Sequence, residues 1–272
     1  MVKSLWTGAS GMTAQQTSLD NIANNISNVN TAGYKKQTTE FASLLYQKLQ
    51  REVTDHNGDP KPVIGQVGSG VRVSGLTSVF TQGSMLETGN DYDMCVDGNG
   101  FFRVMMGDGS LAYTRNGAFQ LAIDEGGVTL ATSEGYPVLD NTGAPISFDT
   151  SVYDVAQLEL DEYGNFMYPD ETGTMRLTGV QIGLAQFNNP AGLVKMSGSL
   201  FAESENSGPA RFETEDPLLR KSKVISGYLE GSNVNVADEI VNLIVTQRAY
   251  EMNSKVINAS DEMMQQANNL RS

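Results

Sequence analysis

Both ends of the chain carry apolar residues at a spacing of seven positions, and the middle does not. Near the N-terminus the repeat consists of Leu5, Met12, Leu19 and Ile26, with Ile22 and Val29 on the adjoining stripe. Near the C-terminus it consists of Val236, Leu243, Tyr250, Ile257 and Met264, flanked by Ala249, Val256, Met263 and Leu270. Such a repeat is typical of the seam of a coiled-coil-like helix. The sequence therefore predicts one amphipathic helix in residues 1–30 and another in residues 236–272.

The two predicted helices differ in intrinsic strength. The C-terminal helix has Asn233 or Asn235 as a candidate N-cap, and two acidic residues follow in its first turn, where negative charge is favourable. The N-terminal helix contains Gly8 and Gly11, each of which costs about 1 kcal/mol relative to alanine. We expect the N-terminal helix to be unstable unless it packs against a partner.

Between the ends the hydrophobic pattern changes to short alternating runs, which indicate β-strands. Clear runs lie at Phe101–Met106, Leu111–Thr114, Phe119–Ile123 and Val128–Ala131, and further ones continue to about Pro190. The segments between the first four runs, "GDGS", "RNGA" and "DEGG", are rich in residues that tolerate positive φ, so we expect hairpin turns there. The middle is therefore predicted to be an antiparallel β domain.

A chain that leaves a helix, builds a β domain and returns to a helix brings its two ends together. The predicted fold class is α+β, with a discontinuous coiled-coil-like helical domain built from both termini and an antiparallel all-β middle domain. The predicted divisions are an N-terminal helix at 1–30, a connecting segment with an insertion at 31–75, the β domain at 76–209, a return connector at 210–235 and a C-terminal helix at 236–272 that pairs with the first.

Negative charge is concentrated in the middle of the chain. The net charge is −14, of which residues 56–235 carry −13, while residues 1–55 carry +1 and residues 236–272 carry −2. This balance argues against a nucleic-acid groove or an anionic membrane surface as partner. No stretch approaches the roughly 20 apolar residues of a membrane span, and "MVKSLWTGASGMTAQQ" lacks the apolar core of a cleaved signal peptide. We therefore expect no nucleic-acid partner and no direct membrane insertion, whereas the nearly neutral ends suit dense packing against copies of themselves.

Residues that carry chemistry are few. Cys95 and His56 are the only residues of their kinds, so a Cys–His nucleophile would have to combine these two, and neither an internal disulfide nor a zinc site of Cys and His alone can form. A buried strand cysteine and a solvated loop histidine are the simpler interpretation. A catalytic carboxylate pair stays open, although no feature favours it. We expect no enzyme activity, no metal and no cofactor.

Asparagines form a second stripe beside the apolar one on the N-terminal helix. Asn21, Asn25 and Asn28 follow the spacing i, i+4, i+7, with Asn24 close by. Asparagine is a poor helix former in water, but in an array of identical helices its amide can bond between subunits and fix their register. An ordinary two-helix core within one chain is the alternative. The predicted self-assembly interface consists of Leu5, Met12, Leu19, Asn21, Ile22, Asn24, Asn25, Ile26, Asn28, Val29, Val236, Ile240, Leu243, Gln247, Tyr250, Ile257 and Met264.

Two stretches of the sequence are distinctive enough to indicate a family. "SLDNIANNISNVNTAGYKKQ" resembles the N-terminal signature of the bacterial flagellar rod and hook proteins, "D-x-I-A-N-N-x-x-N-x-x-T-x-G-[FY]-K", and "LEGSNVNVADEIVNLIVTQRAYEMNSKVINASDEM" resembles the C-terminal signature of the same family. The N-terminal matches are Asp20, Ile22, Ala23, Asn24, Asn25, Asn28, Thr31, Gly33, Tyr34 and Lys35. The C-terminal matches are Ser232, Asn233, Val234, Asn235, Glu239, Asn242, Gln247, Arg248, Tyr250, Glu251, Asn253 and Lys255. The resemblance covers essentially the whole chain and is strongest to the distal-rod members.

The resemblance implies a structural subunit of the flagellar distal rod, which self-assembles into a hollow helical drive shaft and transmits torque from the motor to the hook. The implied partners are further copies of the chain, the proximal rod and hook proteins, the surrounding ring proteins and the flagellar export apparatus. The implied location is the basal body in the periplasmic space, reached by export without a cleaved signal peptide. The terminal helices would form the inner layer of the tube and the β domain the outer layer.

Other interpretations stay open at the level of the sequence. A proximal rod or short hook-type axial protein is the nearest, and a soluble binding module or a cell-wall enzyme with coiled-coil ends is more distant. The segment 46–70 corresponds to a variable insertion of the family, which we interpret as an interaction arm. The sequence "DMCV" departs from the small aliphatic residues of relatives and leaves Met94 and Cys95 without a role.

Overall fold

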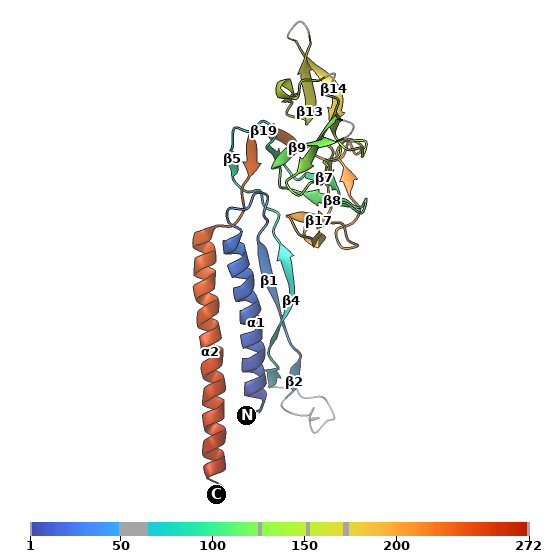
Figure 1. The fold of residues 1–272 in the computed structure, drawn as a ribbon. Helices are drawn as coiled ribbons and strands as arrows, with labels where there is room; N and C mark the ends of the chain where they lie inside the picture. The colour runs from blue at the N-terminus through green and yellow to red at the C-terminus, as the bar shows by residue number, and fades with distance from the viewer. Residues whose placement is uncertain (1, 49–64, 125–126, 151–152, 171–173, 271–272) are drawn as a thin grey trace, which may run out of the picture. The chain divides into compact units, whose positions relative to one another are not determined.

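The computed structural model of the chain describes residues 2–48, 65–124, 127–150, 153–170 and 174–270. Contacts divide the chain into two compact units, which can be followed in Figure 1. The helical unit comprises Met1–Ser27, Gln37–Ser78 and Asn235–Ser272, and the β unit comprises Asn28–Lys36 and Val79–Val234. Two terminal helices and a middle region of antiparallel strands confirm the predicted α+β class. No helix in the described part is both long and apolar enough to cross a membrane.

Two long helices, one from each end of the chain, dominate the helical unit. α1 spans Val2–Ser27 and α2 spans Val236–Asn269. They lie side by side and run antiparallel, because Ser4 near the start of α1 meets Ser260 near the end of α2 (Figure 1). The side chain of Asn235 accepts a hydrogen bond from the Ala237 N–H, so Asn235 is the N-cap of α2.

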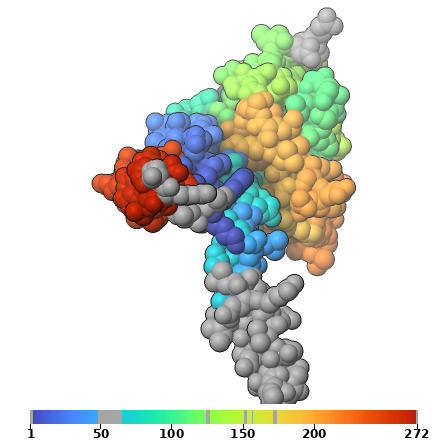
Figure 2. Space-filling view, turned by 90° about the horizontal axis from the view of Figure 1, so that it is seen from below, coloured from blue at the N-terminus to red at the C-terminus, as the bar shows by residue number. Residues whose placement is uncertain are grey.

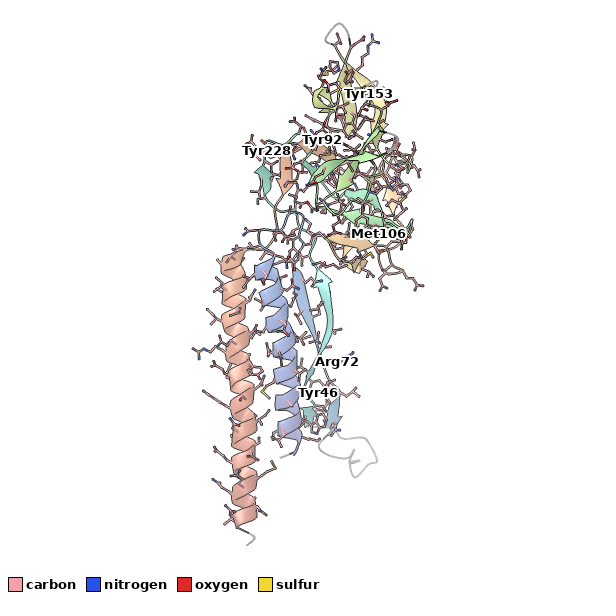
Figure 3. The ribbon with its side chains drawn as sticks, in the orientation of Figure 1. Tyr46, Arg72, Tyr92, Met106, Tyr153 and Tyr228 are labelled. Carbon is pink, nitrogen blue, oxygen red and sulfur yellow. The ribbon has the colours of Figure 1, made fainter. Side chains whose placement is uncertain are left out.

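A two-stranded ribbon lies against α1 on the side away from α2 (Figure 1). β1 (Gln37–Ser43) pairs antiparallel with β4 (Val71–Ser78), with a bulge between Glu40 and Phe41, and β2 (Tyr46–Lys48) pairs with β3 (Gln66–Gly68). Tyr46 and Arg72 project from this ribbon in Figure 3. β1, β2 and β3 lie within the segment 31–75 that the sequence predicts as a connector, and β4 extends past its end to Ser78. The remainder of the predicted insertion, residues 49–64, lies outside the described residues.

The β unit is built from several small antiparallel sheets. The largest has six strands in the order β16-β17-β8-β7-β15-β18, two have three strands, in the orders β11-β10-β9 and β12-β13-β14, and β19 pairs with β6 and β20 with β5. The bounds are β5 Met85–Glu87, β6 Met94–Asp97, β7 Phe101–Met105, β8 Leu111–Thr114, β9 Phe119–Asp124, β10 Gly127–Thr132, β11 Ser147–Phe148, β12 Glu159–Leu160, β13 Asn165–Pro169, β14 Met175–Gln181, β15 Leu184–Gln186, β16 Val194–Lys195, β17 Leu200–Ala202, β18 Arg211–Phe212, β19 Lys223–Ser226 and β20 Tyr228–Glu230, with short 3₁₀ helices at Val155–Gln157 and Pro190–Gly192.

Two apolar clusters hold the β unit together. The larger one gathers Val96, Phe102 and Leu130 with thirteen other buried side chains, and the smaller one centres on Phe101, Tyr113 and Phe201. Aromatic rings within both clusters meet edge to face, for example Phe102 and Phe119 with centroids 5.0 Å apart. At the edge of the larger cluster Tyr92, labelled in Figure 3, donates a 2.6 Å hydrogen bond to the Val155 carbonyl.

One predicted turn has a different role. "GDGS" joins the paired strands β7 and β8, and "DEGG" joins the paired strands β9 and β10, as predicted. The prediction of a hairpin at "RNGA" is wrong, because β8 and β9 belong to different sheets. Its glycine serves a close approach instead: a Cβ on Gly117 would lie 1.6 Å from the Met94 carbonyl oxygen.

Candidate assembly surface

An apolar stripe is exposed along one flank of α2. It consists of Val241, Val245, Met252, Val256, Met263 and Leu270. Each of these residues is between 47% and 90% exposed. At about 100° per residue they fall within a sector of about 60° on the helix surface. Figure 3 shows side chains projecting from α2 away from α1, and in Figure 2 α2 (red) borders the other segments of the helical unit on one side only. We call these six residues the flank stripe.

The buried residues of α2, on the side that meets α1, are polar. Glu239, Thr246 and Ser260 are the buried residues of α2, and together with the half-buried Asn253 they recur every seven positions. The hydroxyl of Ser260 donates a 3.1 Å hydrogen bond to that of Ser4. This polar seam lies about 100° around the helix from the flank stripe.

Two glycines allow α1 to approach α2 closely, Gly8 beside Ile257 and Gly11 beside Asn253 of the polar seam. A Cβ on Gly8 would lie 2.9 Å from Cγ1 of Ile257, and a Cβ on Gly11 would lie 2.8 Å from Nδ2 of Asn253. The glycines that weaken α1 as an isolated helix therefore fit it against α2.

The helical unit has almost no apolar core of its own. Among its described residues, Ala14 and Ile22 are the only hydrophobic ones that are buried. The two apolar clusters found among the described residues lie in the β unit. Burial of apolar surface is the main favourable term in folding. The helical unit thus lacks the term that stabilises a self-contained two-helix core, and it exposes apolar surface instead.

Two members of the predicted amide stripe use their amides within the chain. Nδ2 of Asn25 donates to the Gln37 carbonyl (2.9 Å) and to Oε2 of Glu239 (3.2 Å), and its Oδ1 accepts from the Gln37 N–H (3.0 Å). Nδ2 of Asn21 donates to the same carbonyl (2.8 Å) and to Oγ1 of Thr39 (3.2 Å). α1 ends at Ser27, so Asn28 follows the helix and does not extend the stripe. A role of the stripe between subunits stays a prediction.

The predicted interface residues occupy three environments. Asn21, Ile22 and Asn25 are buried. The half-buried ones are Leu5, Met12, Leu19, Ile26, Asn28, Val29, Leu243, Ile257 and Met264. The exposed ones are Asn24, Val236, Ile240, Gln247 and Tyr250. The C-terminal heptad is therefore divided, because Leu243, Ile257 and Met264 are partly covered while Val236 and Tyr250 are exposed. The flank stripe contains none of the predicted interface residues.

The β unit contains a cluster of buried charges that sequence reasoning missed. Lys35, Glu230 and Arg115 are 1%, 0% and 2% exposed. Nζ of Lys35 lies 2.5 Å from Oε1 of Glu230, and Nη1 of Arg115 lies 3.4 Å from its Oε2. Burial lowers the pKa of Lys35, against the attraction of Glu230, and also lowers the pKa of Arg115. The only signal in the sequence is that Lys35 and Glu230, 195 positions apart, lie in the two stretches that resemble the family signatures.

Cys95 lies on β6 with no exposed surface. Burial, together with the nearby Glu230 carboxylate, raises the pKa of its thiol to about 11. The thiol is therefore protonated at neutral pH, which makes it a poor nucleophile. His56, its predicted candidate partner, lies outside the described residues. Cys95 and its neighbour Met94 are core residues of the β unit.

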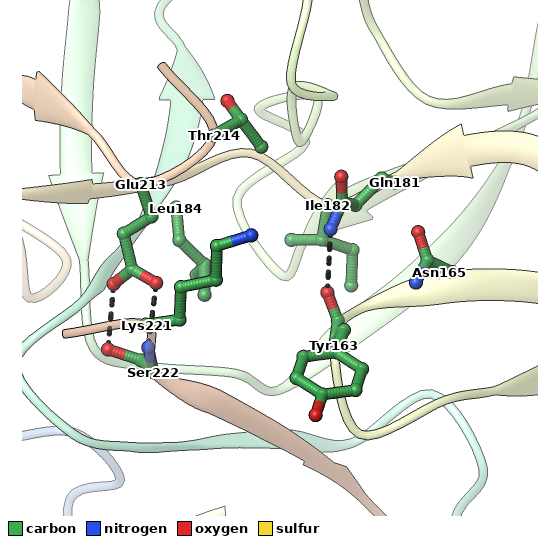
Figure 4. A pocket seen from close by; sticks show the side chains of 9 residues that line it. All are labelled: Tyr163, Asn165, Gln181, Ile182, Leu184, Glu213, Thr214, Lys221 and Ser222. Carbon is green, nitrogen blue, oxygen red and sulfur yellow. Dashed lines mark hydrogen bonds between the residues drawn. The ribbon is translucent and has the colours of Figure 1, made fainter. Parts of the chain in front are cut away.

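A cavity of about 480 Å³ opens in the β unit (Figure 4). Its one buried carboxylate, Glu213, accepts hydrogen bonds from the N–H and hydroxyl of Ser222, both at 2.7 Å, and from Nε2 of Gln186 at 2.8 Å. Saturated in this way, the carboxylate serves packing rather than proton transfer. The described residues contain no group of three or more His, Cys, Asp and Glu side chains placed to hold a metal ion.

Family models match three parts of the chain. Residues 5–35 match the flagella basal body rod protein, residues 95–168 match the D1 domain of the flagellar hook protein FlgE/F/G, and residues 225–270 match the C-terminal region of the flagellar basal body rod FlgEFG proteins. The first and last of these matches contain all the residues that match the two signatures.

Relatives match over the full length. The flagellar basal-body rod protein FlgG of Borreliella burgdorferi is 39% identical over 274 residues, which cover 100% of this chain and 99% of the relative. FlgG of Bacillus subtilis is 37% identical over 271 residues and 100% of both chains. The flagellar hook-basal body complex protein FlhP of the same organism is 30% identical over 281 residues and 100% of both chains. Between these two proteins of one organism, the chain is more similar to FlgG.

Proposed function

The chain belongs to the family of flagellar basal-body rod proteins, and from this premise we propose that it builds the distal rod by self-association through its terminal helices. It is a structural subunit of the distal rod, and it acts in the flagellar basal body together with rod and hook components. The proposal adds the mechanism: copies associate into a hollow helical homopolymer that transmits torque from the motor to the hook.

One observation carries the proposal. The helical unit buries only Ala14 and Ile22 among its described hydrophobic residues, while the six residues of the flank stripe are exposed. Covering a half-exposed large apolar side chain contributes about 1 kcal/mol. Burial of all six side chains in an interface would therefore contribute roughly 6 kcal/mol. This value is at the low end of the roughly 4–15 kcal/mol that association itself costs. A single contact of this kind is marginal, and a polymer in which each copy makes several such contacts is stable.

The charge distribution supports the same arrangement. Residues 1–55 and 236–272 carry +1 and −2, whereas residues 56–235 carry −13. Helices close to neutrality can pack densely at the centre of a tube without strong repulsion, and an acidic β unit is suited to the solvated outside. The surrounding ring proteins, the periplasmic location and export without a cleaved signal peptide belong to the proposal as well.

The test is electron microscopy of the purified protein at rising concentration. We expect tubes from the unmodified chain. Val245→Glu and Met252→Glu each place a charge in the flank stripe, where the side chains are 63% and 61% exposed, and we expect both variants to stay monomeric with unchanged helix content. Asn258→Glu adds the same charge at an exposed position of α2 outside the stripe and should assemble normally.

Two outcomes would contradict the proposal. An unmodified chain that stays monomeric at every concentration would remove self-association as the mechanism. Assembly of Met252→Glu at the same concentration as Asn258→Glu would show that the flank stripe is not the surface involved.

A further inference from the structure

In the β unit, the segment that follows α1 in the chain is bonded directly to the segment that precedes α2. The Gly33 N–H donates to the Glu230 carbonyl (2.7 Å), and the Lys36 N–H donates to Oδ1 of Asn233 (2.8 Å). Lys35 and Glu230 add the ion pair at 2.5 Å. We call residues 33–36 and 230–233, held by these bonds, the clamp.

A third segment closes around the clamp. Nζ of Lys35 donates to the Thr81 carbonyl (2.9 Å), and Nδ2 of Asn233 donates to the carbonyls of Val79 (2.7 Å) and Thr81 (3.1 Å). The Gly83 N–H donates to Oε1 of Glu230 (2.9 Å). Because Lys35 and Glu230 are no more than 1% exposed, water does not compete for these bonds.

The two segments of the clamp run parallel. Position 33 meets 230 and position 36 meets 233, so residue numbers increase together along the pair. Tension between the two ends of the chain acts on the first segment from its N-terminal side and on the second from its C-terminal side. A parallel pair pulled from opposite ends is sheared, so its bonds carry the tension together and do not open one after another.

We propose that the clamp carries mechanical tension between the two terminal helices and shields the rest of the chain from it. Once the contacts between α1 and α2 have parted, the path of the force passes from residues 33–36 directly to residues 230–233, so residues 37–229 form a loop outside it while the clamp holds. The clamp follows from the contacts within the β unit alone. It rests on the proposed function only for the source of the load, which is torque along the rod.

The test is force spectroscopy on the full chain with handles at its two ends. We expect the β unit to open in one step, which releases residues 79–229, roughly 150 residues at about 3.5 Å each, a length on the order of 530 Å. Glu230→Gln removes the charge that pairs with Lys35, and we expect it to lower the force of this step. Glu213→Gln is the matched control, since Glu213 is also a buried carboxylate of the β unit but contacts Ser222 and Gln186 instead of the clamp.

The direction of pulling separates a clamp from general stability. With handles at the exposed residues 108 and 205, we expect Glu230→Gln and Glu213→Gln to lower the opening force alike, whereas pulling from the chain ends should affect Glu230→Gln more. If Glu230→Gln does not fold, Asn233→Ala replaces it, because that change removes hydrogen bonds without leaving a buried charge unpaired.

The proposal is overturned if the unmodified β unit opens in several small steps under tension from the chain ends. It is also overturned if Glu230→Gln, or Asn233→Ala in its place, and Glu213→Gln lower the end-pulling force equally. Electron microscopy of the same proteins keeps the two proposals apart. If tubes form but Glu230→Gln and Glu213→Gln lower the end-pulling force equally, the proposed function stands and the clamp does not. If Glu230→Gln lowers that force more but no tubes form, the clamp is supported and its proposed source of load is removed.

Discussion

Asn25 pairs with the main chain of Gln37 through both ends of its carboxamide. Its Oδ1 accepts from the Gln37 N–H at 3.0 Å, and its Nδ2 donates to the Gln37 carbonyl at 2.9 Å. Two residues of neighbouring antiparallel strands exchange the same pair of bonds, because a carboxamide has the donor and acceptor of a peptide group. Since Nδ2 also meets Glu239, one side chain of α1 contacts both the start of β1 and the first turn of α2.

Asn25→Asp keeps the shape of this side chain and removes its donor. The new carboxylate would face the Gln37 carbonyl and the Glu239 carboxylate, and we expect a loss of about 3 kcal/mol in local stability. Hydrogen exchange of the Gln37 amide measures it, with an expected acceleration of roughly 100-fold. Gln16→Glu makes the same chemical change at an exposed position of α1 and should leave this rate unaltered; equal rates in the two variants would contradict the assignment.

Gly8→Leu tests the contact between the helices. No side chain fits between Gly8 and Ile257, since even a Cβ would lie 2.9 Å from Cγ1. We expect overpacking to cost about 1–3 kcal/mol and to expose the amides of α2 near Ile257 to faster exchange. Ala9→Leu, at the exposed neighbouring position, should stay within about 0.5 kcal/mol of the unmodified chain. A Gly8→Leu variant with unchanged exchange in α2 would show that the helices are not closely packed there.

Gly33→Ala tests the backbone of the N-terminal signature. Gly33 has φ of +68°, and a Cβ there would lie 2.4 Å from the main-chain nitrogen of Asn116. We expect thermal unfolding of the β unit to show a loss of about 2 kcal/mol or more. At Gly107, in the same unit, a Cβ meets nothing within 4 Å, so Gly107→Ala should be neutral or slightly stabilising. Similar midpoints for the two variants would be inconsistent with this conformation.

Because of Cys95, we expect the stability of the β unit to fall at alkaline pH. Its pKa rises from 9.0 to about 11 on folding, so between pH 9 and 11 the unfolded chain loses the thiol proton while the folded chain keeps it. The unfolded state then binds fewer protons, and stability falls as pH rises through this window, by about 2–3 kcal/mol in total. Urea denaturation at a series of pH values measures the fall.

Cys95→Ala should flatten this dependence between pH 9 and 10. Above pH 10 a further fall is expected, because burial raises the pKa of Tyr113 to about 12 and the same sign applies. A slope between pH 9 and 10 that is the same with and without Cys95 would exclude the thiol as its source.

The sequence was sufficient for the elements that depend on local pattern. The heptads located both helices, one of the two candidate caps, Asn235, is the N-cap of α2, and alternation with turn residues located the strands β7 to β10. The signatures identified the family. These features share a physical basis, since periodicity and capping act over a few neighbouring residues.

The features that the sequence did not reveal depend on tertiary contact. Only part of the C-terminal heptad faces α1: Leu243, Ile257 and Met264 are half-buried, whereas Val236 and Tyr250 are exposed, and the buried positions of α2 are polar. The amide of Asn25 is paired with a main-chain group twelve positions away, which no helical pattern marks. The bond between Lys35 and Glu230 spans 195 positions, and neither charge stands out among its neighbours.

The polar seam has a consequence for cooperativity. When the buried residues of α2 are Glu239, Thr246 and Ser260 and the flank stripe stays open, the hydrophobic effect contributes less to the pairing than in a helix pair with an apolar core. Under the proposed function, that contribution comes from neighbouring copies, so a subunit at the tip of a growing polymer has less stable helices than one in its interior. The cooperative folding unit of the helices is then larger than one polypeptide.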